Sequence, residues 1–303
     1  METALISFNQ IVTMIIIMMI GLLCAKTKLI DEETSKKLSA FLLWVVSPLV
    51  IFTSYQRPFE AELLKGLFIA LGLAVLSFAI SILVAHTLYF KKDGKIETIE
   101  KYACIYTNSG FIGIPLVQGV FGSEGVFYLT AFLTTSNLLM WTHGVTIMSG
   151  IKDRSLLKKA FLAPAFIGTI TGFITFLLRI EVPGILLRPM ETVGGTNTAL
   201  AMIIAGVTIS KADIGQIVKK VRIYKVCLIR LLVIPLIVVG VFSFFDFPQT
   251  VVGTIAIAAS CPVAANVILF SYRYDKDSLY ASELFVASTI FSLVTMPILM
   301  LLI

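Results

Sequence analysis

The chain has 303 residues, of which 58% are hydrophobic and only 14% are charged, and its mean hydropathy is +0.97. Soluble globular domains carry about 25% charged residues, so this composition excludes one and predicts an integral membrane protein. The formal net charge is +6.

Ten apolar segments are long enough to be membrane-spanning helices, which need roughly 20 residues each. They are residues 4–24, 37–55, 65–90, 101–119, 125–149, 159–179, 190–209, 224–245, 250–271 and 279–302. The first segment is not a secretory signal, because the residues before it contain Glu2 and no Lys or Arg. The connections are short, so we expect no separate soluble domain.

The basic residues predict the orientation of these segments. With the N-terminus outside, 19 of the 24 Lys and Arg residues fall in cytoplasmic loops and four fall in outside loops. This distribution follows the positive-inside rule, and it explains the +6 charge without nucleic-acid binding. We therefore expect a multi-pass protein of the cell membrane with both termini outside the cytoplasm. Arg230 lies within the eighth segment, and we expect its side chain to reach the cytoplasmic interface.

The fourth segment contains Thr107–Leu116, which should not remain a regular helix. Asn108 brings a polar amide to membrane depth, and Gly110 and Gly113 loosen the backbone. Pro115 removes one amide donor and clashes with the preceding turn. Unpaired backbone groups in hydrocarbon cost several kcal/mol, so such a break is tolerated only inside protein or beside a cavity.

The ninth segment is interrupted in the same way around Pro262, between Ala259 and Val267. Five segments lie in each half of the chain, and an odd number inserts the second half upside down. We therefore expect an all-α fold of two inverted five-helix repeats, residues 1–150 and 151–303. A broken helix in each repeat indicates a transporter with its binding site between the two breaks.

The predicted site suits an anion. Half-helix N-termini present free N–H groups and about +0.5 of a charge, which attracts a carboxylate without a buried lysine. The amides of Asn108 and Asn266 can donate to the same carboxylate, although they could instead only cap freed backbone groups. The predicted substrate-binding residues are Asn108, Ser109, Gly110, Gly113, Pro115, Asn137, Pro262, Ala264 and Asn266, with the two prolines at the crossing of the helices.

Two stretches carry a family resemblance. Tyr106–Gly122 (YTNSGFIGIPLVQGVFG) resembles the fourth-helix signature of the auxin efflux carrier family, and Cys261–Tyr274 resembles its ninth helix, with Cys261 where a first proline is common. The tail Ala281–Pro297 resembles the last helix. The short central loop at 150–158 is similar to that of bacterial and archaeal members.

The resemblance implies a ten-helix fold shared with sodium/proton antiporters and bile-acid symporters, in which helices four and nine cross at their breaks. Helices 1, 2, 6 and 7 would form a scaffold and a homodimer surface. Helices 3–5 and 8–10 would carry the substrate in an elevator-type movement. Members of the family move small organic anions, including indole-3-acetate in plants and malate-like carboxylates in bacteria.

Other classes fit the sequence less well. Hydrolase, metalloprotease and phosphate-loop motifs are missing from the sequence, so we expect neither an enzyme nor a bound cofactor or metal. A sodium/proton antiporter needs an acidic residue at mid-membrane depth, and none is evident. A membrane sensor would need an output domain. Proton symport, sodium symport and uniport all stay open. Gly168 and Gly172 have the spacing of a close helix contact, which could also contribute to a dimer surface.

Overall fold

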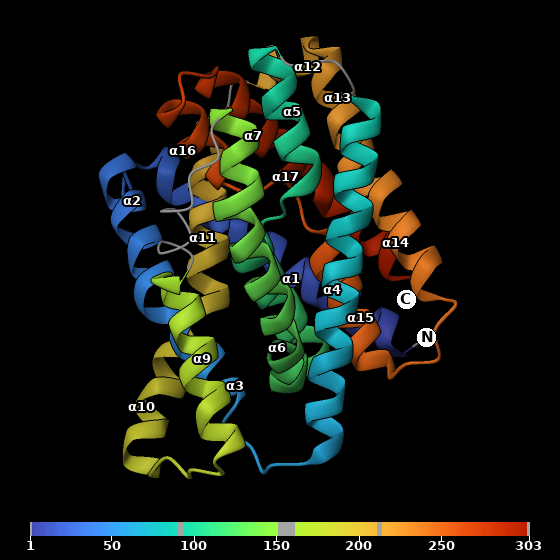
Figure 1. The fold of residues 1–303 in the computed structure, drawn as a ribbon. Helices are drawn as coiled ribbons and strands as arrows, with labels where there is room; N and C mark the ends of the chain where they lie inside the picture. Colours follow the sequence, from blue (N-terminus) through green and yellow to red (C-terminus); the bar gives the residue numbers. More distant parts are fainter. Residues whose placement is uncertain (1, 90–93, 151–160, 211–213, 302–303) are drawn as a thin grey trace.

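The computed structural model describes residues 2–89, 94–150, 161–210 and 214–301 (Figure 1). Within these ranges the protein is built from helices and contains no strand, apart from one isolated bridge. The helices, with π-helical turns written η, are α1 (Glu2–Lys26), α2 (Glu32–Phe41), η1 (Leu42–Val46), α3 (Ser47–Ser54), α4 (Ala61–Leu88), α5 (Lys95–Ile105), η2 (Ser109–Gly113), α6 (Ile114–Leu139), η3 (Met140–Gly144), α7 (Val145–Ser149), α9 (Pro164–Leu177), α10 (Gly184–Gly194), α11 (Asn197–Ser210), α12 (Ile214–Lys219), α13 (Val221–Leu228), η5 (Ile229–Val233), α14 (Ile234–Phe242), α15 (Gln249–Ser260), α16 (Asn266–Arg273) and α17 (Ser278–Met300).

Two helices begin at aspartate caps. The Asp31 carboxylate accepts a 2.8 Å hydrogen bond from the Thr34 amide at the start of α2. The Asp277 carboxylate accepts one of 2.9 Å from the Tyr280 amide at the start of α17. Each cap satisfies an N–H group that the first turn of a helix otherwise leaves unpaired.

The helix labelled α6 consists of two helical pieces that meet at Gly122. This glycine has φ 63° and ψ −153°, a conformation essentially restricted to glycine. An added Cβ would meet nothing within 4 Å, so the backbone conformation alone requires glycine here. The kink falls between the predicted fourth and fifth segments, 101–119 and 125–149.

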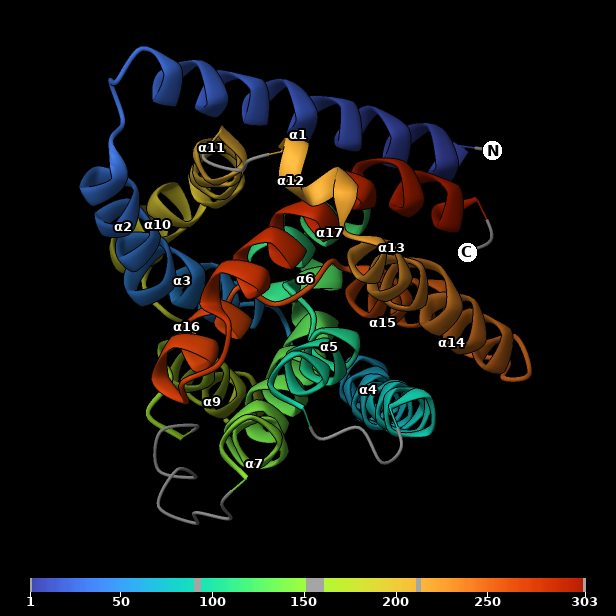
Figure 2. The same cartoon turned by 90° about the horizontal axis from the view of Figure 1, so that it is seen from above.

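One group of helices packs through glycines. α1 packs against α11 at one side of the molecule (Figure 2), and a Cβ on Gly206 would lie 2.0 Å from the Met18 carbonyl oxygen. α3 packs on α9, where a Cβ on Gly168 would lie 2.8 Å from the Pro48 carbonyl oxygen and one on Gly172 would lie 2.7 Å from the Tyr55 ring. Gly168 and Gly172 thus make a close helix contact within the chain, as their spacing predicted, and a homodimer stays a prediction.

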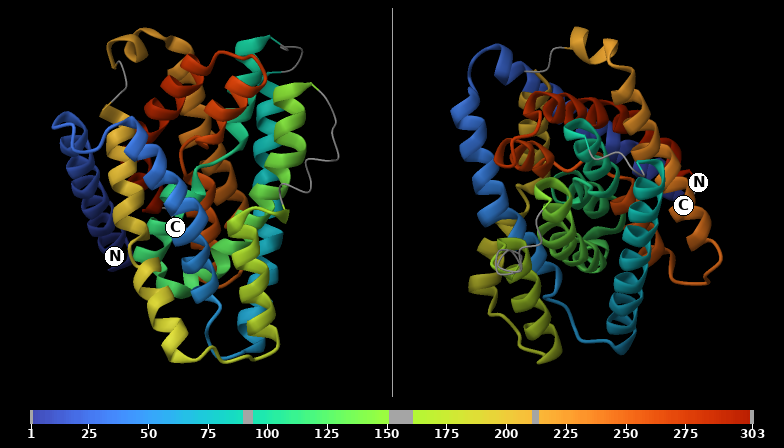
Figure 3. Two further views of the ribbon diagram at one scale, coloured as in Figure 1. Left: turned by 90° about the vertical axis from the view of Figure 1, so that its left-hand side faces the viewer. Right: turned by 45° about the horizontal axis from the view of Figure 1, so that its top comes forward.

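A second group of helices surrounds α6. α4 and α15 both pack on α6, α14 packs on α15, and α16 packs on α17. Figure 3 shows α1 and α11 side by side at one edge, next to this second group. The predicted division into scaffold and mobile helices, and into repeats at residue 151, stays a prediction. That boundary lies within 151–160, outside the described residues.

Six helical stretches of the described chain are long and apolar enough to cross a membrane, namely Glu32–Ser54, Ala61–Leu88, Ser109–Ser149, Gly184–Ser210, Val221–Phe242 and Ser278–Met300. Three shorter apolar helices cover Val12–Lys26, Pro164–Leu177 and Gln249–Ser260. Large apolar side chains are exposed on the outer faces, including Trp44 and Leu83. The fold is that of an integral membrane protein, and the count of ten crossings stays a prediction.

Candidate functional site

The two predicted breaks lie against each other. α5 ends at Ile105 and α15 ends at Ser260, and Thr107 and Val263 then form an antiparallel bridge. The main-chain amide of Asn108 donates to the Pro262 carbonyl oxygen over 2.8 Å, and the main-chain amide of Ala264 donates to the Tyr106 carbonyl oxygen over 3.0 Å. Backbone groups released by one break are therefore satisfied by the other, as a low-dielectric interior requires.

A half-helix starts shortly after each of the two residues that form this bridge. η2 begins at Ser109 and α16 begins at Asn266. Within the described residues, the amides of Ser109, Gly110, Ala265 and Asn266 donate no hydrogen bond. A Cβ on Gly110 would meet nothing within 4 Å, so space lies open beside this turn. Two half-helix N-termini with free N–H groups thus flank the bridge, and this arrangement favours negative charge.

The amide side chains of the predicted site differ in their partners. Asn108 is 7% exposed, and no hydrogen bond of its side chain is found among the described residues. Asn266 is half-buried and donates from Nδ2 to the thioether of Met140 over 2.8 Å, a weak acceptor. Asn137 is half-buried in α6. Asn108 therefore has donor capacity to spare inside the protein.

The crossing corrects two details of the predicted site. Thr107, not Pro115, pairs across the bridge, and Pro115 lies beyond η2 in the first turn of α6. η2 runs directly into α6, so Pro115 lies in a continuous helical stretch, and the residue that the π-helical turn adds just before it accommodates the proline. The Ala264 amide is engaged by Tyr106, so the free donors on that side are those of Ala265 and Asn266.

Gly113 has a packing role at the crossing. A Cβ on Gly113 would lie 3.2 Å from the Cβ of Ser109 and 3.3 Å from the Cys261 sulfur. Ser109 is 2% exposed, and Cys261 is fully buried. Glycine therefore allows η2 to approach the end of α15 closely.

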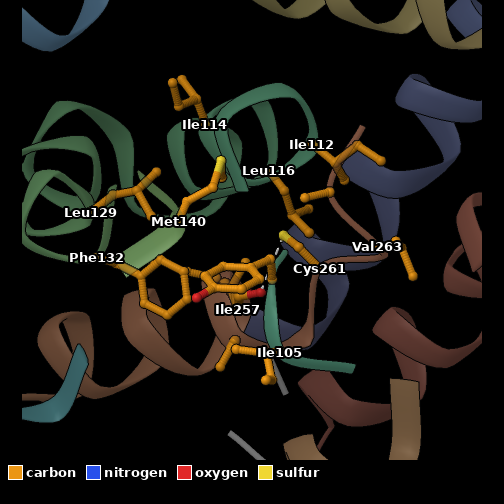
Figure 4. Close-up of a cluster of buried hydrophobic side chains, with 14 of the residues drawn as sticks. Ile105, Ile112, Ile114, Leu116, Leu129, Phe132, Met140, Ile257, Cys261 and Val263 are labelled. Carbon is orange, nitrogen blue, oxygen red and sulfur yellow. Dashed lines mark hydrogen bonds between the residues drawn. The ribbon is translucent and has the colours of Figure 1, made fainter. Parts of the chain in front are cut away.

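Apolar side chains surround the crossing. Figure 4 shows them converging from α5, η2, α6, η3, α15 and the second break. The labelled side chains are Ile105, Ile112, Ile114, Leu116, Leu129, Phe132, Met140, Ile257, Cys261 and Val263. Removal of water from this region strengthens electrostatic interactions between a charged group and the half-helix ends.

A small cavity of about 20 Å³ lies between α1 and α11 on one side and η2, α6 and α17 on the other. This volume holds about one water molecule. Four methionines line the cavity, together with Ile112, Leu116, Ser292 and Leu293. We call these four cavity-lining residues, Met14, Met18, Met202 and Met296, the methionine seam.

A larger cavity, of about 530 Å³, lies away from the crossing. It is enclosed by the end of α3 and the connection between α9 and α10, and its lining includes Arg57, Phe59 and Arg179. Burial lowers the pKa of the Arg57 guanidinium below its usual value. Because this cavity touches neither break, its size does not identify it as the site.

Three residues near the crossing were not predicted as part of the site. The Ser288 hydroxyl of α17 accepts a 3.2 Å hydrogen bond from the Val263 amide. The Thr107 hydroxyl is buried and has no partner among the described residues. Ser288 and Thr107 are polar residues within apolar segments, and this could have marked both as candidates for the site. The spacing of residues in the sequence cannot show that α17 contacts the second break.

The third residue is Arg230, for which the predicted position is wrong. Its side chain does not reach an interface, because it is 0% exposed. Its guanidinium donates to the carbonyl oxygens of Cys104 and Cys261, each over 3.1 Å, and to that of Ala259. The available indication was that Arg230 is the one basic residue well inside a predicted segment.

The two buried carboxylates of the described chain have basic or phenolic partners. Glu100 accepts from Arg222 Nε over 2.7 Å and from the Tyr280 hydroxyl over 2.7 Å. Glu283 accepts from Lys220 Nζ over 2.5 Å. These pairs tie the starts of α5, α13 and α17 together.

Comparisons with known proteins agree with this architecture. A family model described as "Membrane transport protein" matches residues 6–157 and 151–300. An "Uncharacterized transporter" of Methanothermobacter thermautotrophicus is 24% identical over 298 residues, which cover 96% of this chain and 97% of the relative. A "Putative malonate transporter" of Rhizobium meliloti is 22% identical over 288 residues, which cover 88% and 87%.

The family matches span nearly the whole chain. The chain therefore belongs to this family of membrane transport proteins, the auxin efflux carrier family, as the resemblance of its fourth helix predicted. It is a multi-pass membrane transporter for a small molecule.

Proposed function

We propose that this member of the auxin efflux carrier family moves a small organic anion, such as a dicarboxylate, by elevator-type alternating access. The observation that carries the proposal is the pair of half-helix N-termini beside the bridge, with free amides at Ser109, Gly110, Ala265 and Asn266. Each N-terminus contributes about +0.5 of a charge, so the two together balance about one carboxylate.

Asn108 supplies the side-chain recognition in this proposal. Asn108 is only 7% exposed, its side chain has no hydrogen-bond partner among the described residues, and a substrate carboxylate would accept a hydrogen bond from its amide. Asn266 would exchange the weak Met140 contact for a stronger acceptor.

The name of the Rhizobium meliloti relative favours a dicarboxylate over an auxin-like carboxylate as the first substrate to test.

The methionine seam supports an elevator movement. Unbranched thioether side chains adapt to changing neighbours, so a mobile unit could change its apolar contacts with α1 and α11 there. The 3.3 Å hydrogen bond from the Gln10 side chain of α1 to the Pro115 carbonyl oxygen would break in such a movement. The scaffold would consist of helices 1, 2, 6 and 7, with a homodimer formed there.

A sodium/proton antiporter is the second candidate, because the family resemblance implies a shared fold. That chemistry needs a carboxylate that exchanges protons for sodium at the crossing. The buried carboxylates of the described chain, Glu100 and Glu283, are instead bound by Arg222 and Lys220. The geometry therefore favours an anion transporter.

The test is uptake of labelled malonate, malate, succinate and indole-3-acetate into proteoliposomes, together with thermal stability in each ligand. A ligand at 100 times its Kd stabilises the folded state by about 2.7 kcal/mol. We expect one carboxylate class to stabilise the protein and to be transported. Asn108→Ala should weaken its binding by roughly 10- to 100-fold, because a hydrogen bond to a charged group is lost.

Asn9→Ala is the matched control, since the Asn9 side chain is exposed on α1. It should leave binding unchanged. A folded Asn108→Ala protein with wild-type transport and binding would overturn the proposed role of Asn108. Absence of stabilisation by every carboxylate, with a response to sodium or pH alone, would favour the antiporter.

A further inference from the structure

Arg230 joins the two broken helices at their C-terminal ends, whereas the free amides belong to the half-helices that follow the breaks. It lies in η5, and its fully buried guanidinium donates to carbonyl oxygens at the ends of both α5 and α15. No ion pair between Arg230 and a carboxylate is found in the described ranges. The partners of this buried charge are thus backbone carbonyls, those of Cys104, Ala259 and Cys261.

The charges at the crossing account for this arrangement. The C-terminus of a helix carries about −0.5 of a charge, so the ends of α5 and α15 together carry about −1. The single positive charge of Arg230 balances them. The N-termini of η2 and α16 keep their positive ends uncompensated, and the crossing is left electropositive on the side where Asn108 lies.

Backbone carbonyls at half-helix C-termini are also the groups that bind coupling sodium ions in transporters with broken helices. Here a guanidinium attached to the chain occupies such a group of carbonyls, which we call the carbonyl cage (the carbonyl oxygens of Cys104, Ala259 and Cys261). A guanidinium presents five N–H donors in a planar fork and stays protonated, so it can satisfy several carbonyls at once.

We propose that Arg230 is a built-in cation that fills the carbonyl cage, so that the protein holds and moves its anion without binding sodium. The coupling part rests on the proposed function, whereas occupancy of the cage does not. Arg230 acts as a positioning residue: it holds the two breaks in register and leaves the N-termini of η2 and α16 positive for the substrate.

The first experiment uses the wild-type protein. Thermal stability is measured in NaCl, KCl and choline chloride at equal ionic strength, and carboxylate uptake is measured with and without a sodium gradient. We expect the same melting temperature in all three salts and the same uptake rate with either gradient. A sodium-specific rise in melting temperature or a several-fold sodium stimulation of uptake would overturn the proposal.

The second experiment empties the cage with Arg230→Gln and keeps a charge there with Arg230→Lys. Arg188→Gln, which removes an exposed guanidinium on α10, is the control. We expect Arg230→Gln to lower uptake at least tenfold and to gain a sodium-specific rise in melting temperature. Arg230→Lys should retain more uptake than Arg230→Gln and stay insensitive to sodium.

A merely structural Arg230 would destabilise the protein on substitution but would not create a sodium response. The proposal is contradicted if the melting temperature of Arg230→Gln does not change with sodium, or if its uptake equals that of wild type. If Arg230→Gln does not fold, the wild-type salt comparison still decides the question. If no carboxylate is transported at all, the proposed function fails, and the sodium response of the melting temperature still tests the cage.

Discussion

The main-chain amide of Asn108 donates a 2.8 Å hydrogen bond to the carbonyl oxygen of Pro262, a residue far away in the sequence, at the crossing of the two breaks. This bond uses the acceptor that Pro262 presents and the main-chain donor of Asn108, which leaves the Asn108 side chain available. A backbone bond thus fixes the position of a side chain that we assign to substrate recognition.

The close approach of η2 to α15 predicts an energetic coupling between Gly113 and Cys261. Gly113→Ala places a methyl group 3.3 Å from the Cys261 sulfur, so we expect it to destabilise the protein by about 1–3 kcal/mol. Cys261→Ala makes room and should reduce the penalty of Gly113→Ala in the double variant. Thermal unfolding of the four proteins in a double-mutant cycle measures this coupling, and strictly additive effects would contradict the contact.

The conformation of Gly122 predicts a cost that does not come from crowding. Gly122→Ala should destabilise the protein by about 1–3 kcal/mol, because alanine is strained at φ 63° and ψ −153°. Gly72 also has nothing within 4 Å of an added Cβ, but it lies inside α4, so Gly72→Ala should be neutral or stabilising. Equal melting temperatures for the two variants would show that the kink does not require glycine.

The Arg222–Glu100 pair predicts a larger loss than a surface pair. The Glu100 side chain is 3% exposed and the Arg222 side chain is 49% exposed. Arg222→Gln therefore leaves the buried Glu100 carboxylate without the positive charge of its guanidinium partner. We expect a loss of roughly 2–3 kcal/mol, below the value for a fully buried pair because water reaches Arg222. Lys36→Gln, which breaks the exposed pair with Glu32, should cost under about 1 kcal/mol. Similar losses in both variants would contradict the structural importance of the Arg222 pair.

The Asp31 cap predicts a specific pH dependence. Hydrogen bonds from Thr34 lower the pKa of the Asp31 carboxyl in the folded protein below its ordinary value of about 3.9. The ionised form therefore stabilises the fold above that value, and this contribution disappears as the pH falls through the lowered pKa. Asp31→Ala should reduce the melting temperature at neutral pH, and its difference from wild type should shrink below about pH 4.

Asp246→Ala provides the comparison for the cap, since Asp246 is exposed between α14 and α15. Its melting temperature should follow that of wild type at each pH. A difference between Asp31→Ala and wild type that stays constant down to about pH 3 would argue against the cap as its cause.

The sequence predicted that the fourth and ninth segments break, because Asn108, Pro115 and Pro262 are costly in a regular lipid-facing helix. It did not predict which residues pair across the breaks. A proline shows where an amide donor is missing, but the crossing at Thr107 and Val263 depends on how two distant segments meet. The π-helical turn η2, which lets Pro115 sit inside α6, leaves no distinct pattern in the sequence.

Arg230 shows a second limit of sequence reasoning. Hydropathy rules direct a lone arginine toward the nearest interface, because a buried charge is expensive. The tertiary fold instead supplies carbonyl oxygens from two helix ends, and neither end is near Arg230 in the sequence. Gly168 and Gly172 are similar: their spacing indicated a close contact but not that the partner is α3 of the same chain.

The methionine seam would accommodate an oxidised side chain poorly, although its four buried methionines are shielded from oxidants. Conversion of a thioether to a sulfoxide turns a flexible apolar side chain into a polar one. In a seam whose cavity holds about one water molecule, a sulfoxide on Met14, Met18, Met202 or Met296 would have few partners. Oxidation there would thus stiffen the surface along which the proposed movement occurs, and methionine sulfoxide reductases would restore it.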